Sequence, residues 1–371
     1  MKTLTHEIIL GNIKPRLKIG TVVLLRGECT YVGGMERGVE ISSPARAALA
    51  LMTGEVSCLE MSTSLDLPIS EIAQLVAELD QAAFLDTEPA KIAVHTRFHS
   101  PNSNRASYEG DDSNDGAFQQ MKIKLLPELS FTTWLAGIRD GGVGLMGARR
   151  EREVSIVGDS RIACLLYGIL LASGVSMTAL ISNKDHRTIT EDLLCAGFLR
   201  PSDIGLSLSA RAAECARELS LFPIHKSGVG ADKSGQKLAI VVGNPPADQI
   251  QKWMSEGVPH LLIGGPDAAS LTVGPLVIPG RTPCARCVAI TQEEGNEIWR
   301  DIVWQKITAE PVEVPVAVSH HVAGLVALEL LRFMDEGQSA LIGSSVRIDF
   351  HNPSRSERRV FTRHPACGCN W

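Results

Sequence analysis

Long apolar segments are the first feature that this sequence lacks. No run of about 18 consecutive apolar residues occurs, so the sequence gives no clear membrane-spanning helix. The N-terminus does not show a basic stretch followed by an apolar one, which is the pattern of a secretory signal peptide. Positive charge is not in excess either, because the net charge is −6 at pH 7, and nothing in this total favours nucleic acid or an anionic membrane as a partner. We therefore expect a cytoplasmic protein.

The remaining composition is that of an ordinary soluble globular chain. Apolar residues make up 44% of the sequence and charged residues 21%, which are usual shares for folded domains. The length of 371 residues allows two or three domains.

Disulfide bonds are not expected in a reducing compartment, so the nine cysteines need another explanation. Four of them form two close pairs, Cys284 with Cys287 and Cys367 with Cys369. Two such pairs are typical of a four-thiolate zinc site, in which each tight loop supplies two ligands. Four thiolates leave no open coordination position, so such a site is structural and not catalytic. Two alternatives stay open: the cysteines are free or disulfide-bonded, or His364 replaces one sulfur.

Residues 1–95 begin with a strand pattern. Short strands are expected at 17–25, 30–32 and 39–42, and Gly33-Gly34 marks a turn between two of them. These strands predict a small sheet.

Three helices are expected after these strands. The first covers about 45–52, the second about 57–64, and the third begins at Pro68. Apolar residues recur at helical spacing along the third: Ile69, Ile72, Val76, Leu79 and Ala83. A small sheet with three helices, ending in helix-turn-helix, is the pattern of a winged helix.

The third helix has no positive charge. From residue 69 to residue 85 there is no Lys or Arg, whereas Glu71, Glu78 and Asp80 are present. A helix that enters the major groove of DNA lies next to phosphates and is expected to be basic. We therefore favour a winged helix that accepts a peptide strand on its exposed sheet edge. A DNA-binding regulator and a purely structural cap are the alternatives.

The peptide-binding hypothesis names six candidate contacts. Strand residues come from the expected edge strand, and groove residues from the side of the third helix that the apolar stripe leaves outward. These residues are Val39, Glu40 and Ile41 on the strand, and Leu75, Glu78 and Ala82 on the helix.

A polar segment separates this module from the rest of the chain. Residues 96–120 contain Pro, Gly, Ser, Asn and Asp and few residues that could be buried, so we expect a flexible linker there. Residues 121–371 then form the second domain. Its strands at 154–157 and 175–181 flank a helix at 161–172, which is a βαβ unit at the spacing of a nucleotide-binding fold.

Further strands and helices alternate along the second domain. Strands are expected at 238–242, 260–263, 271–278 and 346–350, and a long apolar helix at 316–333. This alternation predicts an α/β fold with a mostly parallel, Rossmann-type sheet.

The loop of the βαβ unit is a poor phosphate-binding loop. It reads Gly158-Asp-Ser-Arg-Ile-Ala163, and only the first glycine of Gly-x-Gly-x-x-Gly is present. Asp159 places a negative charge where phosphate would lie, and the second strand ends at Ser182 without an acid for a ribose hydroxyl. ATP is therefore not expected as a cofactor, and structural Zn²⁺ is the metal that we expect.

Several of these features resemble a known superfamily. The βαβ start, Asp203-Ile-Gly205, the Ala-rich helix 323–331 and the paired cysteines resemble the ThiF/MoeB adenylating enzymes. Three segments, in particular, resemble Ocin-ThiF-like proteins of thiazole/oxazole-modified peptide pathways. They are Asp192 to Gly205, Val273-Gly-Pro-Leu-Val-Ile-Pro-Gly-Arg-Thr-Pro-Cys-Ala-Arg-Cys287, and His364-Pro-Ala-Cys-Gly-Cys369.

The resemblance implies a function in the biosynthesis of ribosomally made, modified peptides. Such proteins bind the leader of a precursor peptide through a winged helix-turn-helix domain and partner a YcaO-type cyclodehydratase that forms azolines. A homodimer is possible, as in the superfamily.

The chain departs from the active adenylating enzymes in ways that bear on catalysis. Beyond the broken glycine loop, Leu206-Ser207 stand where a Lys is expected, and Gly243-Asn244 follow the strand where an Asp-rich turn is expected. Acyl-adenylate formation needs phosphate charge that is neutralised and positioned. We therefore expect a non-catalytic partner protein. The alternative is a divergent ATP-dependent adenylating enzyme that acts on a peptide carboxylate.

Overall fold

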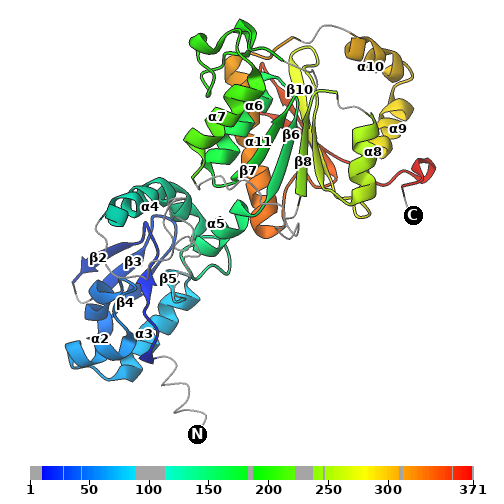
Figure 1. Cartoon of the computed structure of the whole chain (residues 1–371). Coiled ribbons are helices and arrows are strands. Elements are labelled where there is room, and N and C mark those ends of the chain that lie inside the picture. Colours follow the sequence, from blue (N-terminus) through cyan, green and yellow to red (C-terminus); the bar gives the residue numbers. More distant parts are fainter. Residues whose placement is uncertain are drawn as a thin grey trace. The chain divides into compact units, whose positions relative to one another are not determined.

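The fold is known from a computed structural model of the chain, which divides into two compact units, residues 1–147 and 148–371 (Figure 1). The structure describes residues 11–27, 29–42, 44–88, 113–182, 187–221, 237–244, 247–308, 312–352 and 354–369. Each unit is described below by itself.

The first unit contains two small antiparallel sheets. Strands β2 (Val22–Arg26), β3 (Cys29–Gly33) and β4 (Gly38–Ile41) form one, and β1 (Arg16–Leu17) pairs with β5 (Leu85–Asp86) in the other. The single strand expected at 17–25 is thus divided. A turn at Gly20, whose φ is +87°, separates its two parts, and Lys18, which precedes this turn, is buried.

Three helical segments follow β4, as expected: the 3-10 helix η1 (Pro44–Leu51), α2 (Cys58–Leu65) and α3 (Ile69–Gln81). Ser57 caps α2 in a capping box with Glu60, in which each side chain accepts a backbone N–H of the other residue. The apolar stripe of α3 packs with residues of all these elements into one core: Val32, Ile41, Ala45, Ala48, Met61, Ile72, Leu75, Val76 and Leu79.

Residues beyond the expected linker belong to the first unit as well. Lys18 donates from Nζ to the carbonyl oxygens of Thr133 (2.6 Å) and Ile138 (2.9 Å), and Trp134 Nε1 donates to the carbonyl oxygen of Ile19 (3.0 Å). Thr133 also donates from its hydroxyl to Asp86. These bonds hold the segment after helix α4 (Ser113–Thr132) against the N-terminal strands. Of the expected linker 96–120, residues up to 112 lie outside the described part.

A seven-stranded sheet forms the centre of the second unit, in the order β12-β11-β10-β9-β8-β6-β7. The strands are β6 (Glu153–Val157), β7 (Met177–Ile181), β8 (Lys237–Val242), β9 (His260–Ile263), β10 (Ser270–Val277), β11 (Ser344–Asp349) and β12 (Ser356–Val360). Neighbours from β7 to β9 are parallel, whereas β10, β11 and β12 add antiparallel. The expected α/β sheet is therefore present, in a mixed form whose strands from β7 to β9 are parallel.

Helices lie against this sheet on both sides (Figure 1). Helices α6 (Arg161–Ala172), α7 (Leu208–Leu219) and α11 (Val316–Glu336) belong to its main core, and α8 (Ala247–Glu256) packs with β6 and β8 in a second cluster. Helices α9 (Ala285–Gly295) and α10 (Trp299–Thr308) follow β10, and short 3-10 turns occur at Glu191–Leu193, Pro201–Asp203 and Pro365–Cys367. Helix α5 (Val143–Arg150) precedes β6. Helix α11 is long and apolar enough to span a membrane. Its buried residues between Val322 and Met334, however, belong to the main core, in which α11 packs against α6.

A buried ion pair ties α5 to the end of α11. Arg149 and Asp335 have side chains only 2% and 4% exposed, and the Arg149 Nη2 atom lies 2.5 Å from Asp335 Oδ2. Arg149 Nη1 also donates to the carbonyl oxygen of Ser173. Both charges are thereby satisfied inside the unit, as buried charges must be.

Candidate functional site

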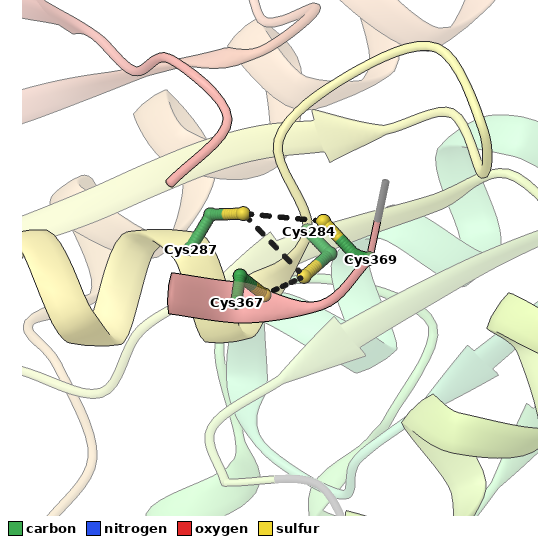
Figure 2. Close-up of side chains that lie close together, drawn as sticks. All are labelled: Cys284, Cys287, Cys367 and Cys369. Atoms are coloured by element: carbon green, nitrogen blue, oxygen red, sulfur yellow. Dashed lines mark hydrogen bonds between the residues drawn. The ribbon is translucent and has the colours of Figure 1, made fainter. Parts of the chain in front are cut away.

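The four cysteines of the predicted metal site meet in the second unit (Figure 2). Their Sγ atoms all lie within 4.8 Å of one another, and Cys284, Cys287 and Cys367 are buried while Cys369 is half-buried. Sγ of Cys284 lies 3.8 Å from that of Cys287 and 3.4 Å from that of Cys367, and the sulfurs of Cys287 and Cys369 are 3.3 Å apart. Four thiolates around a tetrahedral Zn²⁺, each at about 2.3 Å, lie about 3.8 Å apart. The cluster is therefore consistent with a metal site.

Local structure explains how each pair is presented. A turn after β10 is closed by the Ile278 N–H donating to Thr282 Oγ1 (2.8 Å), and it leads to Cys284, the N-cap residue of α9. On the other loop Gly368 has a φ of +71°, a conformation that glycine adopts without strain and that lets Cys367 and Cys369 face the same point.

The environment of Cys287 favours its thiolate. Burial raises the pKa of this thiol, but N–H donors at His364 and Cys284 and the neighbouring thiols outweigh burial and lower the pKa to about 7. The His364 N–H lies 3.3 Å from Cys287 Sγ. The His364 ring is used elsewhere, because its Nε2 contacts Glu294 Oε1 (3.0 Å) and its Nδ1 accepts the Ala366 N–H. In this arrangement His364 supports the cluster through its backbone.

The predicted peptide-binding strand is an edge of the first unit. β4 pairs with β3 alone among the described strands. Its residues differ in position: Ile41 is buried in the core, Val39 is half-buried and packs against that core, and the side chain of Glu40 is exposed. A peptide at this edge would thus meet the backbone and Glu40.

The helix residues predicted for the groove need a correction. Leu75 is 2% exposed and packs inside the core, so it offers no surface to a peptide. The helical stripe is wider than the four inward positions assumed from the sequence, because Leu75, four residues before Leu79, extends the buried face on that side. Ala82 is half-buried against the core, and Glu78 is exposed.

The opposite edge of this sheet is more apolar than the sequence suggested. The large side chains of β2 are exposed, from 42% at Val23 to 74% at Leu25. β2 pairs with β3 alone among the described strands. The apolar run Val22-Val-Leu-Leu25 was the available signal, but the sequence predicted there only a strand at 17–25.

The N-terminus of α6, where a nucleotide-binding fold places phosphate, is filled by a residue of the chain itself. The Arg161 N–H donates to Glu313 Oε2 (3.0 Å), and Arg161 Nη1 donates to the carbonyl oxygen of Val314 (3.0 Å). Burial raises the pKa of the Glu313 carboxyl, and the Arg161 N–H opposes this shift only in part. An acid therefore occupies the anion position of this helix.

A second acid lies in the same loop. Asp159 Oδ2 accepts the Ser182 hydroxyl (3.0 Å) and lies 3.7 Å from Arg187 Nε. The polar groups at the ends of β6 and β7 are thus joined to one another.

Comparisons with known proteins find structures whose fold is similar over almost the whole chain. No family model and no curated protein matches the sequence. Among solved structures, E. coli MccB with MccA-N7isoASN is 15% identical, with a TM-score of 0.62 over 96% of this chain and 99% of that chain. MccB with ATP is 14% identical, with a TM-score of 0.58 over 96% and 99% of the two chains. The heterocyclase TruD is 13% identical, with a TM-score of 0.55 over 96% of this chain and 42% of TruD.

At these identities the likeness concerns the fold. The chain has the fold of MccB and TruD, and it carries a four-cysteine cluster consistent with a metal site.

Proposed function

We propose that this protein binds the leader of a ribosomally made precursor peptide and delivers it to a YcaO-type cyclodehydratase in the cytoplasm. The first unit is the leader-binding, winged-helix domain in this proposal, and the second unit is a ThiF-like scaffold. The protein itself carries out no step of azoline formation.

One observation carries the proposal: the three-stranded sheet of the first unit has two edges that pair with no other described strand. An extended peptide gains affinity at such an edge from backbone hydrogen bonds and specificity from side-chain contacts. The fold adds support, because MccB, which has the same fold, has been solved with MccA.

A scaffold role for the second unit is supported by its own side chains. Glu313 takes the N–H at the start of α6, and Asp159 adds a second acid to the loop. A nucleotide phosphate would meet two acids there, one of which already accepts the N–H at the start of the helix. In the proposal, Cys284, Cys287, Cys367 and Cys369 hold a structural Zn²⁺, which fixes the two loops and supplies no reaction step.

Titration calorimetry tests the leader-binding role. The full chain is titrated with the leader of the precursor peptide encoded beside its gene, and with a scrambled leader as the control. The proposal predicts a one-to-one complex with the true leader alone. Equal heats from both peptides, or no heat from either, would exclude leader binding.

The same assay identifies the edge that the peptide uses. Gly34 donates its N–H to the carbonyl oxygen of Arg37 at the β3–β4 turn. Along an antiparallel strand, backbone N–H groups point alternately toward the neighbouring strand and away from it. Counted from this pair through the register, the N–H of Glu40 on β4 and that of Val23 on β2 both point away from β3. Glu40→Pro and Val23→Pro each remove one such N–H. The sequence argument favours β4, so Glu40→Pro should weaken leader binding while Val23→Pro should not. The reverse result would move the peptide to β2.

The competing function is ATP-dependent adenylation of a peptide carboxylate, which is favoured by the solved complex of MccB with ATP. ATP-dependent pyrophosphate exchange decides between the two functions. Pyrophosphate exchange by the protein with a peptide substrate would show that the protein is an adenylating enzyme and not a scaffold. The proposal predicts no exchange. Raised thermal stability in ATP and Mg²⁺ would point the same way.

A further inference from the structure

The outermost strand of the seven-stranded sheet is fully exposed. Among the described strands, β12 (Ser356–Val360) pairs with β11 alone, through the register from Ser344↔Val360 to Ile348↔Ser356. All five of its residues are exposed. Such an edge leaves N–H and C=O groups that another strand can pair with.

The edge is strongly basic. Residues 354–363 contain Arg355, Arg358, Arg359 and Arg363 and a single acid, Glu357, in a chain whose net charge is −6. Glu357 lies 3.7 Å from Arg347 on β11. Within the described part of the chain, no carboxylate lies at ion-pair distance from any of the four arginines of this segment.

Neutral neighbours hold two of these arginines in place. Arg358 donates from Nε and Nη2 to Ser344 Oγ, both at 3.3 Å. Arg359 donates to Gln292 Oε1 (2.9 Å), and its guanidinium lies 5.4 Å from the Phe361 ring centre. Since neighbouring residues of a strand face opposite sides, the two cations flank the edge on both faces of the sheet. Their positions are fixed in advance while their charges stay unneutralised, which lowers the entropy lost when an anion binds.

We propose that β12 is a docking edge for an extended acidic segment of a partner protein. The segment adds to the sheet as an eighth strand, so that its backbone pairs with β12 and its Glu or Asp side chains reach Arg358 on one face and Arg359 on the other. A nucleic acid also carries negative charge but has no peptide backbone to continue the hydrogen-bond ladder, so the unpaired edge favours a peptide. This surface belongs to the second unit and does not depend on leader binding.

The test uses the full-length protein and fluorescein-labelled probes, followed by anisotropy. The acidic probe is Glu-Glu-Val-Glu-Glu-Val-Glu-Glu. Its three comparison probes are the same peptide with alternate backbone nitrogens methylated, the peptide with Lys in place of Glu, and an oligothymidine of equal charge. The proposal predicts binding of the acidic peptide, weakening with salt, and little binding of the other three.

Matched variants locate the site. R355E/R358E/R359E should weaken binding of the acidic peptide by about tenfold or more, because charge-assisted contacts are lost on both faces. The control R200E/R217E/K252E makes the same change in net charge at exposed positions elsewhere in the unit and should leave binding unchanged. Circular dichroism and thermal unfolding check that both variants are folded.

Several results would overturn the proposal. They are equal weakening in both variants, unchanged binding of the methylated peptide, tighter binding of oligothymidine than of the acidic peptide, and no binding of any probe. The proposal is supported if the wild-type protein binds the acidic peptide, if backbone methylation abolishes this binding, and if the β12 variant but not the control variant binds the peptide more weakly.

Discussion

Glu313 Oε2 accepts the backbone N–H of Arg161 at 3.0 Å, at the first residue of α6. The two residues are far apart in the sequence, and their contact closes the helix N-terminus that the βαβ unit presents. Sequence patterns alone indicated that the loop was poor for phosphate. The contact shows what occupies that helix end in the folded chain.

Glu313 should make stability depend on pH. Burial raises its pKa above the ordinary value of 4.5, so the folded state retains a proton that the unfolded chain releases. The free energy of unfolding should therefore fall as pH rises through 4.5 toward the raised pKa of the folded state. Glu313→Gln keeps an acceptor for Arg161 and removes the titration, so the fall should be smaller in this variant.

Urea unfolding of both proteins, from about pH 4 to pH 7, measures this difference. The matched control is Glu60→Gln, which alters an exposed capping acid whose pKa is lowered by the Ser57 N–H and hydroxyl. Because its lowered pKa places the titration of Glu60 below pH 4.5, this variant should leave the fall in stability above pH 4.5 as it is in the wild type. Identical pH profiles for wild type and Glu313→Gln would contradict the prediction.

Loss of one sulfur should abolish metal binding. Cys367→Ser removes one of four clustered thiols. Structural zinc contributes on the order of 10 kcal/mol in small zinc domains, so the second unit should unfold at much lower denaturant. Zinc content by mass spectrometry should fall from one ion per chain to none.

Cys29→Ser is the control, since Cys29 lies on β3 in the first unit and outside the cluster. It should keep one zinc per chain. Wild-type protein without zinc, or Cys367→Ser with full zinc, would show that the cluster is a group of free thiols.

Breaking the buried pair of Arg149 and Asp335 should be costly. Asp335→Asn leaves the Arg149 charge in an environment where its side chain is only 2% exposed, and the loss is expected to be about 3–5 kcal/mol of unfolding free energy. Replacing both residues by apolar ones, as in R149M/D335L, should cost less than Asp335→Asn alone.

Chemical denaturation measures these losses, with Glu293→Gln as the control. Glu293 pairs with Arg300 at 2.6 Å on the surface, and solvent screens such a pair. Its substitution should leave stability unchanged. If Asp335→Asn behaves like Glu293→Gln, the buried pair does not contribute to stability as its burial implies.

Lys18→Met should loosen the segment that follows α4. Lys18 is 4% exposed, and its Nζ donates to two carbonyl oxygens, at Thr133 and Ile138. Without a donor, these carbonyls are left unsatisfied, at a cost of about 1–3 kcal/mol each. Hydrogen exchange should speed up at residues 133–138 in this variant. Lys14→Met, at an exposed position four residues before Lys18, should leave exchange there unchanged.

Periodic apolar segments could be predicted closely from the sequence. The bounds of α6 and β9 agree with those expected, because each is a short segment of consistent apolar pattern between clear end signals. The four cysteines also meet as predicted, because two paired motifs have few other ways to be satisfied.

Three features could not be predicted, each for a physical reason. β12 consists of Ser-Glu-Arg-Arg-Val, and an exposed edge strand needs no apolar alternation, so the pattern search ended at β11. Lys18 is buried because two carbonyl oxygens more than a hundred residues away accept its bonds. Glu313 was not recognised because its contact with Arg161 is long-range, and helix-end signals are read only locally.

The position of β12 also has a mechanical consequence. Only residues 361–366 separate Val360, the last residue of the strand, from Cys367. If the four thiolates bind an ion, Cys367 connects the end of β12 to the metal through this short segment. A force that a bound partner applies to β12 is then transmitted through the metal–sulfur bonds to α9 and to the turn after β10. The strand is then anchored near one end by coordination and at the other by its hairpin, so a partner can pull on it without peeling it from the sheet.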